Sequence, residues 1–171
     1  MFKPMIAVAL TVPLLGGAAV AADGGQHGPI RVRLSGAQED PTVITDGRGT
    51  AVLRIQGSTI AYDLSYRALN GDITQAHIHI GQNDNTGGIA AFLCSNVGGG
   101  GPGTPACPPD PGQVAGVLDA DDVVDTAVLQ GVGPGEIGNL IRAIRAGLDY
   151  VNVHSSTSPV GEIRGDVDRQ H

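Results

Sequence analysis

The sequence predicts a mainly β domain, an antiparallel β-sandwich or Greek-key-like barrel with one short late helix and a disulfide-pinned loop. Three observations support this prediction. Apolar and polar residues alternate along several short segments, which is the period of a strand with one buried face. Turn-forming residues separate these segments at short intervals. Apolar residues at helical spacing appear late, over residues 137–144.

Residues 1–22 have the three regions of a secretory signal peptide. Lys3 precedes an apolar run over residues 5–17, and small residues follow at 18–22. We expect cleavage near Ala21 or Ala22 and a periplasmic or secreted product, although an N-terminal core helix is the alternative. Residues 23–171 then suit a single domain with its core at about 30–168.

Three segments that follow the predicted signal peptide alternate as strands do: residues 30–35, 51–56 and 60–67. Side chains two residues apart share one face of a strand, so each segment has an apolar face for the core and a polar face for solvent. Gly57-Ser58 is typical of a tight hairpin. Further turn signals stand at residues 46–47 and 70–71.

Two further strand-like segments, residues 75–81 and 150–154, carry His77, His79 and His154 at alternating positions. If the aliphatic residues of each segment face the core, the three imidazoles face outward together. Converging neutral imidazoles can hold copper or zinc with one coordination position open. A solvated polar face without metal is the second interpretation, and the spacing leaves both open.

The sequence has two cysteines, Cys94 and Cys107. In an exported protein such a closely spaced pair usually forms a disulfide, and we predict that these two residues are bonded. The bond would hold a glycine- and proline-rich loop, residues 97–116, that has little apolar area of its own. A pair of metal-binding thiolates is the alternative, although no CxxC spacing occurs.

The predicted helix contains Ile137, Leu140, Ile141 and Ile144, and Gly147 is a typical stop signal just beyond it. An acidic cluster precedes this helix. We interpret it as the solvated start of a short helical turn. Calcium ligation is the alternative, although the glycine and terminal glutamate of an EF-hand loop are missing. The cluster consists of Asp119, Asp121, Asp122 and Asp125.

The formal net charge is −7, and removal of Lys3 with the signal peptide makes it one unit more negative. Such a chain repels nucleic acid and anionic lipid, which makes both unfavourable partners. No second apolar run is long enough for a membrane span after signal removal. The serine hydrolase, Walker, Rossmann and HExxH motifs are absent from the sequence, so it offers no catalytic residues of those classes.

Five segments in order resemble the CHRD domain, the module named after chordin. This resemblance covers nearly the whole mature chain and implies an extracytoplasmic β-rich domain with no established activity. The matching segments are LSGAQEDP at 34–41, GTA at 49–51, AHIHIG at 76–81, AG at 146–147 with YVNVH at 150–154, and PVGEIRG at 159–165.

Residues 77–94, HIHIGQNDNTGGIAAFLC, are also similar to the copper-binding stretch of copper/zinc superoxide dismutases. That resemblance implies that His77, His79 and His154 are copper ligands and that Arg164 is an electrostatic guide near the open position. Residues 81–116 contain no histidine, so the bridging and zinc ligands of that family are missing. An ion pair that holds the last strand is the structural interpretation of Arg164, and we prefer it.

These observations predict an exported CHRD-type protein that acts as an extracytoplasmic binding or structural module. Its partner would be an unidentified protein or envelope component, and catalysis is not expected. The alternative is a copper-binding protein with a superoxide-dismutase-like three-histidine site at His77, His79 and His154. Copper is then the expected cofactor.

Overall fold

The computed structural model describes residues 28–82 and 85–168. The predicted signal peptide, residues 1–22, lies outside these residues, and its cleavage stays a prediction. The described chain forms eight strands in one antiparallel sheet of order β5-β4-β7-β8-β1-β2-β3-β6. The strands are β1 Ile30–Ser35, β2 Arg48–Gln56, β3 Thr59–Arg67, β4 Ile73–Ile80, β5 Ile89–Ser95, β6 Gly112–Leu118, β7 Asp149–Ser155 and β8 Ile163–Asp166.

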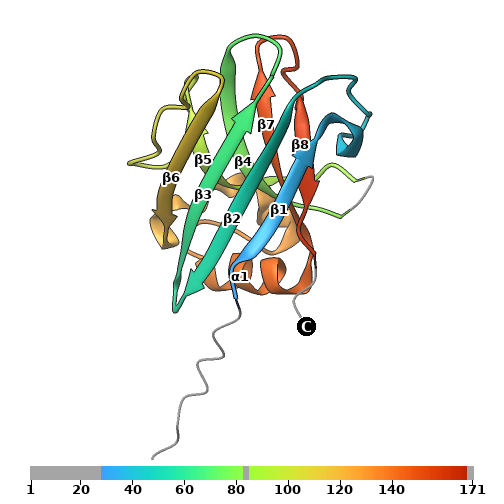
Figure 1. Cartoon of the computed structure of the whole chain (residues 1–171). Helices are drawn as coiled ribbons and strands as arrows, with labels where there is room; N and C mark the ends of the chain where they lie inside the picture. Colours follow the sequence, from blue (N-terminus) through green and yellow to red (C-terminus); the bar gives the residue numbers. More distant parts are fainter. Residues whose placement is uncertain (1–27, 83–84, 169–171) are drawn as a thin grey trace, which may run out of the picture.

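The sheet curls until its two edge strands, β5 and β6, come into contact. Figure 1 shows β6, β3, β2 and β1 across the front of the molecule, with β5, β4 and β7 behind them. The hydroxyl of Tyr62 on β3 crosses the interior and donates to the carbonyl of Leu93 on β5, at 2.7 Å. The result is the nearly closed, barrel-like antiparallel fold that the alternating segments predict.

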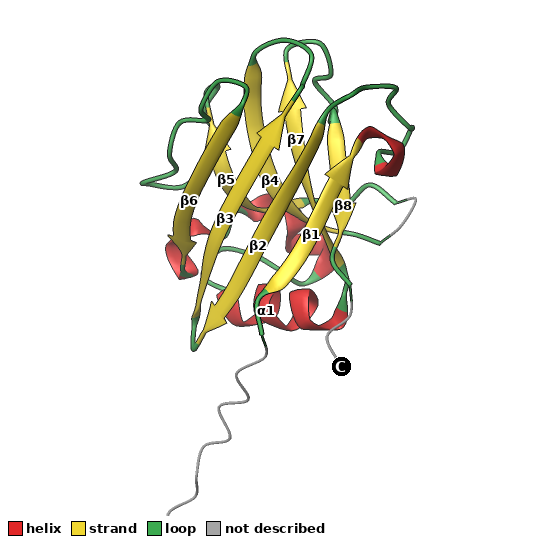
Figure 2. Cartoon of the chain, in the orientation of Figure 1, coloured by secondary structure: helices red, strands yellow, loops and turns green. Residues whose placement is uncertain are grey.

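The predicted hairpin and helix are both present. Gly57 and Ser58 connect β2 to β3, and Gly57 has a φ of +60°, a conformation that glycine adopts without strain. Helix α1, Ile137–Ala146, closes one end of the barrel (Figure 2) and buries its apolar stripe there. It ends at Gly147, which is left-handed and donates its amide to carbonyls of the last turn.

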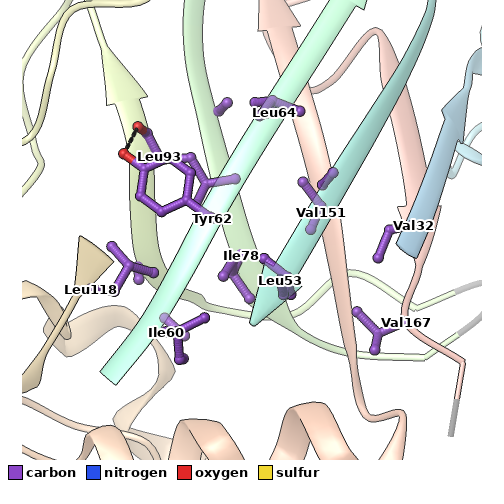
Figure 3. Close-up of a cluster of buried hydrophobic side chains, with 14 of the residues drawn as sticks. Val32, Leu53, Ile60, Tyr62, Leu64, Ile78, Leu93, Leu118, Val151 and Val167 are labelled. Atoms are coloured by element: carbon purple, nitrogen blue, oxygen red, sulfur yellow. Dashed lines mark hydrogen bonds between the residues drawn. The ribbon is translucent and has the colours of Figure 1, made fainter. Parts of the chain in front are cut away.

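The core lies inside the barrel, where the apolar set of each strand meets (Figure 3). Strand β3 shows the pattern clearly, since Ile60, Tyr62, Leu64 and Tyr66 are buried and the residues between them are not. Fully buried aliphatic side chains contribute about 1.5 to 3 kcal/mol each to folding. The central group contains Val32, Leu53, Ile60, Leu64, Ile78, Leu93, Val151 and Val153, all with no exposed surface.

The predicted disulfide between Cys94 and Cys107 is present, with the two Cα atoms 4.9 Å apart. It excludes the thiolate interpretation because neither sulfur is free. Asn96 supports the same loop, since its amide donates to the carbonyls of Ile73 at 2.8 Å and Cys107 at 3.0 Å. The amide of Cys107 donates back to Asn96 Oδ1 at 3.0 Å.

Three short 3₁₀ helices complete the described fold: η1 Gly36–Gln38, η2 Ala120–Asp122 and η3 Asp125–Gln130. The acidic cluster caps η2, because Asp119 accepts from the amide of Asp121 and Asp122 accepts from the amide of Asp119. This is the helix start that the sequence predicts. Among the described residues, no helix has the length and apolar character to span a membrane.

Candidate metal centre

The register of neighbouring strands brings the three histidines together. On β4 and β7, His77 lies opposite Asn152 and His79 lies opposite Tyr150. His154, two residues beyond Asn152, is therefore the diagonal neighbour of His77 on the same face. The alternate residues, among them Ile78, point into the core. The sequence prediction that the three imidazoles share the outer face is confirmed.

The second interpretation of this face, as a solvated polar surface, is wrong. His77 is 1% exposed, His79 is 7% exposed and His154 is 8% exposed. Other parts of the chain cover them: the edge of Phe92 packs on His77 with ring centroids 4.4 Å apart, and the carbonyls of Gly87 and Pro159 contact the other two rings. Loops that cross the outer face therefore make a second, polar interior.

The loop over His79 approaches closely because of Gly87. A Cβ at that position would lie only 1.5 Å from the carbonyl oxygen of Ile80, so any other residue would force the backbone away. With glycine, the loop brings the carbonyl of Gly87 to 3.0 Å from Nδ1 of His79. The local sequence thus permits a contact that orients the imidazole.

The nitrogen atoms of the three rings are within reach of one cation. Nδ1 of His77 is hydrogen-bonded to Nε2 of His154 at 3.1 Å, and one nitrogen from each of the three histidines lies within 4.8 Å of the others. Bonds of about 2.0 to 2.1 Å to a metal place ligand nitrogens roughly 3.3 to 3.6 Å apart. Binding would require a pair at the full 4.8 Å to approach by about 1.2 to 1.5 Å.

Backbone carbonyls select the tautomers of two rings. Nδ1 of His79 donates to Gly87 at 3.0 Å, and Nδ1 of His154 donates to Pro159 at 3.0 Å. Nε2 of each ring then carries the lone pair, which is how outer contacts orient metal-binding histidines, and that of His154 accepts from Nδ1 of His77 at 3.1 Å. Nε2 of His79 is buried without a protein hydrogen bond, as are Nε2 of His77 and Oδ1 of Asn152.

Burial keeps the cluster neutral. Loss of solvent, with repulsion from the neighbouring imidazoles, lowers the pKa of His77 to about 2. Loss of solvent lowers the pKa of His79 to about 4, although its hydrogen bond to Gly87 opposes this shift. Burial also lowers the pKa of His154. Neutral imidazole is the form that binds metal, so no proton has to be displaced at neutral pH.

Arg164 lies beside the cluster and has a structural role. Its guanidinium pairs with Asp166 at 2.9 Å and donates to the carbonyls of Gln82 at 2.8 Å and Asn85 at 3.2 Å. Its Cζ lies 3.5 Å from the centroid of the Tyr150 ring. At 2% exposure it is buried, so the guanidinium does not offer a surface charge that could guide an anion. The preferred interpretation, an ion pair on the last strand, is confirmed.

Sequence reasoning missed several residues of this region. Tyr150 stacks on His79 with ring centroids 4.6 Å apart and planes 6° from parallel, and Phe92 covers His77. Two buried acids were also missed: burial raises the pKa of Asp149 to about 8 and that of Glu39 to about 7. For Asp149 the alternation itself was the signal, because it shares the inward position with Val151 and Val153.

The comparisons agree with this picture of the fold. The family model described as CHRD domain matches residues 30–167, which spans every strand of the barrel. No curated protein and no solved structure matches the chain. The local similarity to copper/zinc superoxide dismutases thus rests on the residues quoted for it alone. On the extent of the family match, the chain belongs to the CHRD-domain family.

Proposed function

We propose that this protein is an exported CHRD module that binds one copper ion through His77, His79 and His154. The observation that carries the proposal is the buried convergence of three imidazoles, with one nitrogen from each within 4.8 Å of the others. Two of the rings are oriented by backbone carbonyls, and two Nε2 atoms are buried without a protein hydrogen bond. Buried nitrogens without a partner are uncommon in a core, and two of them beside a third, carbonyl-oriented imidazole support a ligand set.

The donor set favours copper over other divalent metals. Imidazole nitrogen suits copper and zinc, and the intrinsic affinity of nitrogen donors is highest for copper. Among the described residues, the cluster includes no carboxylate or thiolate, so the ligands do not neutralise the charge of the ion. We therefore expect copper to bind better than zinc, and the smaller cost of burying a single charge is the reason to include the monovalent copper ion in the titration.

We propose binding and not turnover. The rings of Phe92 and Tyr150 pack on the histidines, and each histidine is less than a tenth exposed. A substrate would have to displace this cover to reach the ion. Export is part of the proposal, supported by the Cys94–Cys107 disulfide, which is stable in oxidising compartments, and by the predicted signal peptide.

The test is titration of the chelator-stripped protein with monovalent copper, divalent copper and zinc, followed by calorimetry and by competition with a chromogenic chelator. We expect one copper per chain, lost in a His77→Ala, His79→Ala double variant. The matched control is a His27→Ala, His171→Ala variant, which removes the two remaining histidines of the sequence and should keep the stoichiometry.

Equal binding by the wild type and the His77, His79 variant would overturn the copper proposal, and so would an absence of binding. The protein would then be pursued as a structural or adhesive envelope module through partner capture. Mass determination of the mature N-terminus after expression in a bacterial host tests export separately. The expected first residue follows Ala21 or Ala22.

A further inference from the structure

A second set of polar side chains gathers on the outer face of β1, β2 and β3, away from the histidines. These strands lie side by side at the front of Figure 1. Their outward positions are rich in arginine although the chain has a net charge of −7. The exposed set consists of Arg31, Arg33, Arg48, Arg54 and Arg67.

The register concentrates three of these arginines at one place. Arg48 on β2 lies directly opposite Arg67 on β3. Arg33 on β1 lies opposite Thr50, which makes it the diagonal neighbour of Arg48. Directly opposed side chains have Cβ atoms about 4.5 to 5.5 Å apart, and diagonal ones about 7 to 8 Å apart. One small group can therefore reach all three guanidinium groups.

The surface is hollowed at this point. An open groove of about 340 Å³ is lined by the three arginines together with Thr50, Ser65 and Tyr66. Thr50 and Ser65 lie opposite each other on β2 and β3, between the arginine positions. Their hydroxyls add neutral hydrogen-bond donors to a site whose other donors are cationic.

No carboxylate pairs directly with the arginines of the groove among the described residues. Among the residues that the structure describes, Arg33, Arg48 and Arg67 have no carboxylate within 4.0 Å. Asp63, on the same face of β3, is held by the amide of Gln113, and the carboxylate of Asp110 accepts from the backbone amides of Ala68 and Leu69. Like charges directly opposite each other destabilise a sheet, so the arrangement calls for a counter-anion.

We propose that this groove is a binding site for a tetrahedral oxyanion, a phosphate or sulfate group. The guanidinium plane matches two oxygens of such a group, and several arginines can share its charge. Arg31 continues the positive face along β1, two residues from Arg33, so neighbouring anionic groups of a polymer can bind beside the first. The shared ligand chemistry is the sulfate or phosphate group, either free or carried on an envelope polymer.

The first test compares sodium phosphate and sodium sulfate with sodium chloride at equal ionic strength, by calorimetry and thermal unfolding. The wild type should bind phosphate and sulfate and unfold at a higher temperature in either one. An Arg48→Ala, Arg67→Ala double variant should bind at least tenfold more weakly. Arg54→Ala is the matched control, because Arg54 lies on the same face of β2 about 20 Å along the strand from Arg48.

A second titration distinguishes the source of the group by comparing dextran sulfate with unmodified dextran. If the affinity for dextran sulfate, counted per sulfate group, is more than tenfold above that for inorganic sulfate, multivalent binding assigns the site to a polymer. Equal affinities would assign it to the free ion. The proposal would be overturned if chloride raised the unfolding temperature as much as phosphate and sulfate do, or if Arg54→Ala weakened binding as much as the double variant does. Either result would show only a diffuse effect of positive charge. Retained copper binding and cooperative unfolding verify that the double variant is folded.

Discussion

The outer faces of two parts of the sheet carry polar residues in the same alternating pattern, yet their environments are opposite. We call β4, β7 and β8 the covered half and β1, β2 and β3 the open half. In the covered half, His77, His79 and Arg164 are at most 7% exposed because loops cross over them. In the open half, Arg48 and Arg67 remain exposed. Alternation therefore says which face a residue occupies, and not whether that face meets water.

The difference has chemical consequences. In the covered half, burial holds the imidazoles neutral and their carbonyl contacts orient them, which suits a metal ion. In the open half, arginines stay charged and solvated, which suits an anion. A single curved sheet thus carries two proposed sites for ions of opposite charge, a cation site beneath its loops and an anion site on its surface. The following predictions test this contrast, from the largest expected effect to the smallest.

Loss of the arginine in the covered half should have the largest effect. Arg164→Ala leaves the carbonyls of Gln82 and Asn85 without their donor and leaves Asp166 unpaired. We expect a loss of about 3 kcal/mol in the free energy of unfolding, within the range for a broken buried pair. Urea denaturation measures this effect. A loss below about 0.5 kcal/mol would show that the loops do not depend on Arg164.

Loss of the disulfide should cost nearly as much and act on β5 and its neighbour β4, next to the rest of the covered half. A Cys94→Ser, Cys107→Ser variant releases a crosslink between residues 13 apart in sequence, worth about 3 kcal/mol in the chain-entropy model. Hydrogen exchange should rise in β4 and β5 before it rises in β1 and β2. Uniform acceleration in all four strands would mean that the two halves open together.

The metal-free protein should be most stable near pH 6.5. As pH falls from 6.5 towards 4, unfolded histidines gain protons that buried His77 and His79 do not take up, so stability is lost. Asp149 and Glu39 act in the opposite sense, because each keeps a proton in the folded state that its unfolded carboxyl has released. Burial also lowers the pKa of His154, which adds a third histidine to the two that oppose the acids, so the balance is a loss of stability as pH falls.

Above pH 6.5 the buried acids Asp149 and Glu39 determine how stability depends on pH. The free energy of unfolding should fall by about 2 kcal/mol as pH rises through 8. The folded pKa of Asp149 is raised, so its contribution is complete at low pH and is lost as pH rises through about 8. An Asp149→Asn variant should flatten this alkaline limb and make the acidic limb steeper, because one of the two acids that oppose the histidines is gone. Thermal unfolding from pH 4 to pH 9 checks both limbs, and an unchanged alkaline limb would contradict the assignment to Asp149.

Loss of an arginine in the open half should have the smallest effect. Arg67→Ala removes an exposed side chain and relieves its repulsion with Arg48, so the free energy of unfolding should change by no more than about 0.5 kcal/mol. In low-salt buffer without phosphate or sulfate the variant should be equal to or slightly more stable than the wild type. A loss comparable to that of Arg164→Ala would remove the distinction between the two halves.

Much of the fold could be predicted because its signals are local. The alternation in β3 places Tyr62 and Leu64 inside, the Gly57-Ser58 pair makes the hairpin, and Gly147 ends α1, each for reasons contained within a few residues. The Cys94–Cys107 bond follows from the presence of two cysteines in a chain predicted to be exported. The shared face of the three histidines follows from alternation and the pairing of β4 with β7.

Burial of that face could not be predicted, because it depends on where distant segments lie. The carbonyls of Gly87 and Pro159 reach His79 and His154 only when the loops fold back over the sheet. The opposition of Arg48 and Arg67 depends likewise on strand register. By itself, the sequence determined most of the strands, their faces and the crosslink, since these follow from local periodicity and residue type, whereas β6 begins at Gly112, inside the segment predicted as a loop. Only the tertiary structure decided which face is covered and which is open, since solvent access depends on contacts between residues far apart in the chain.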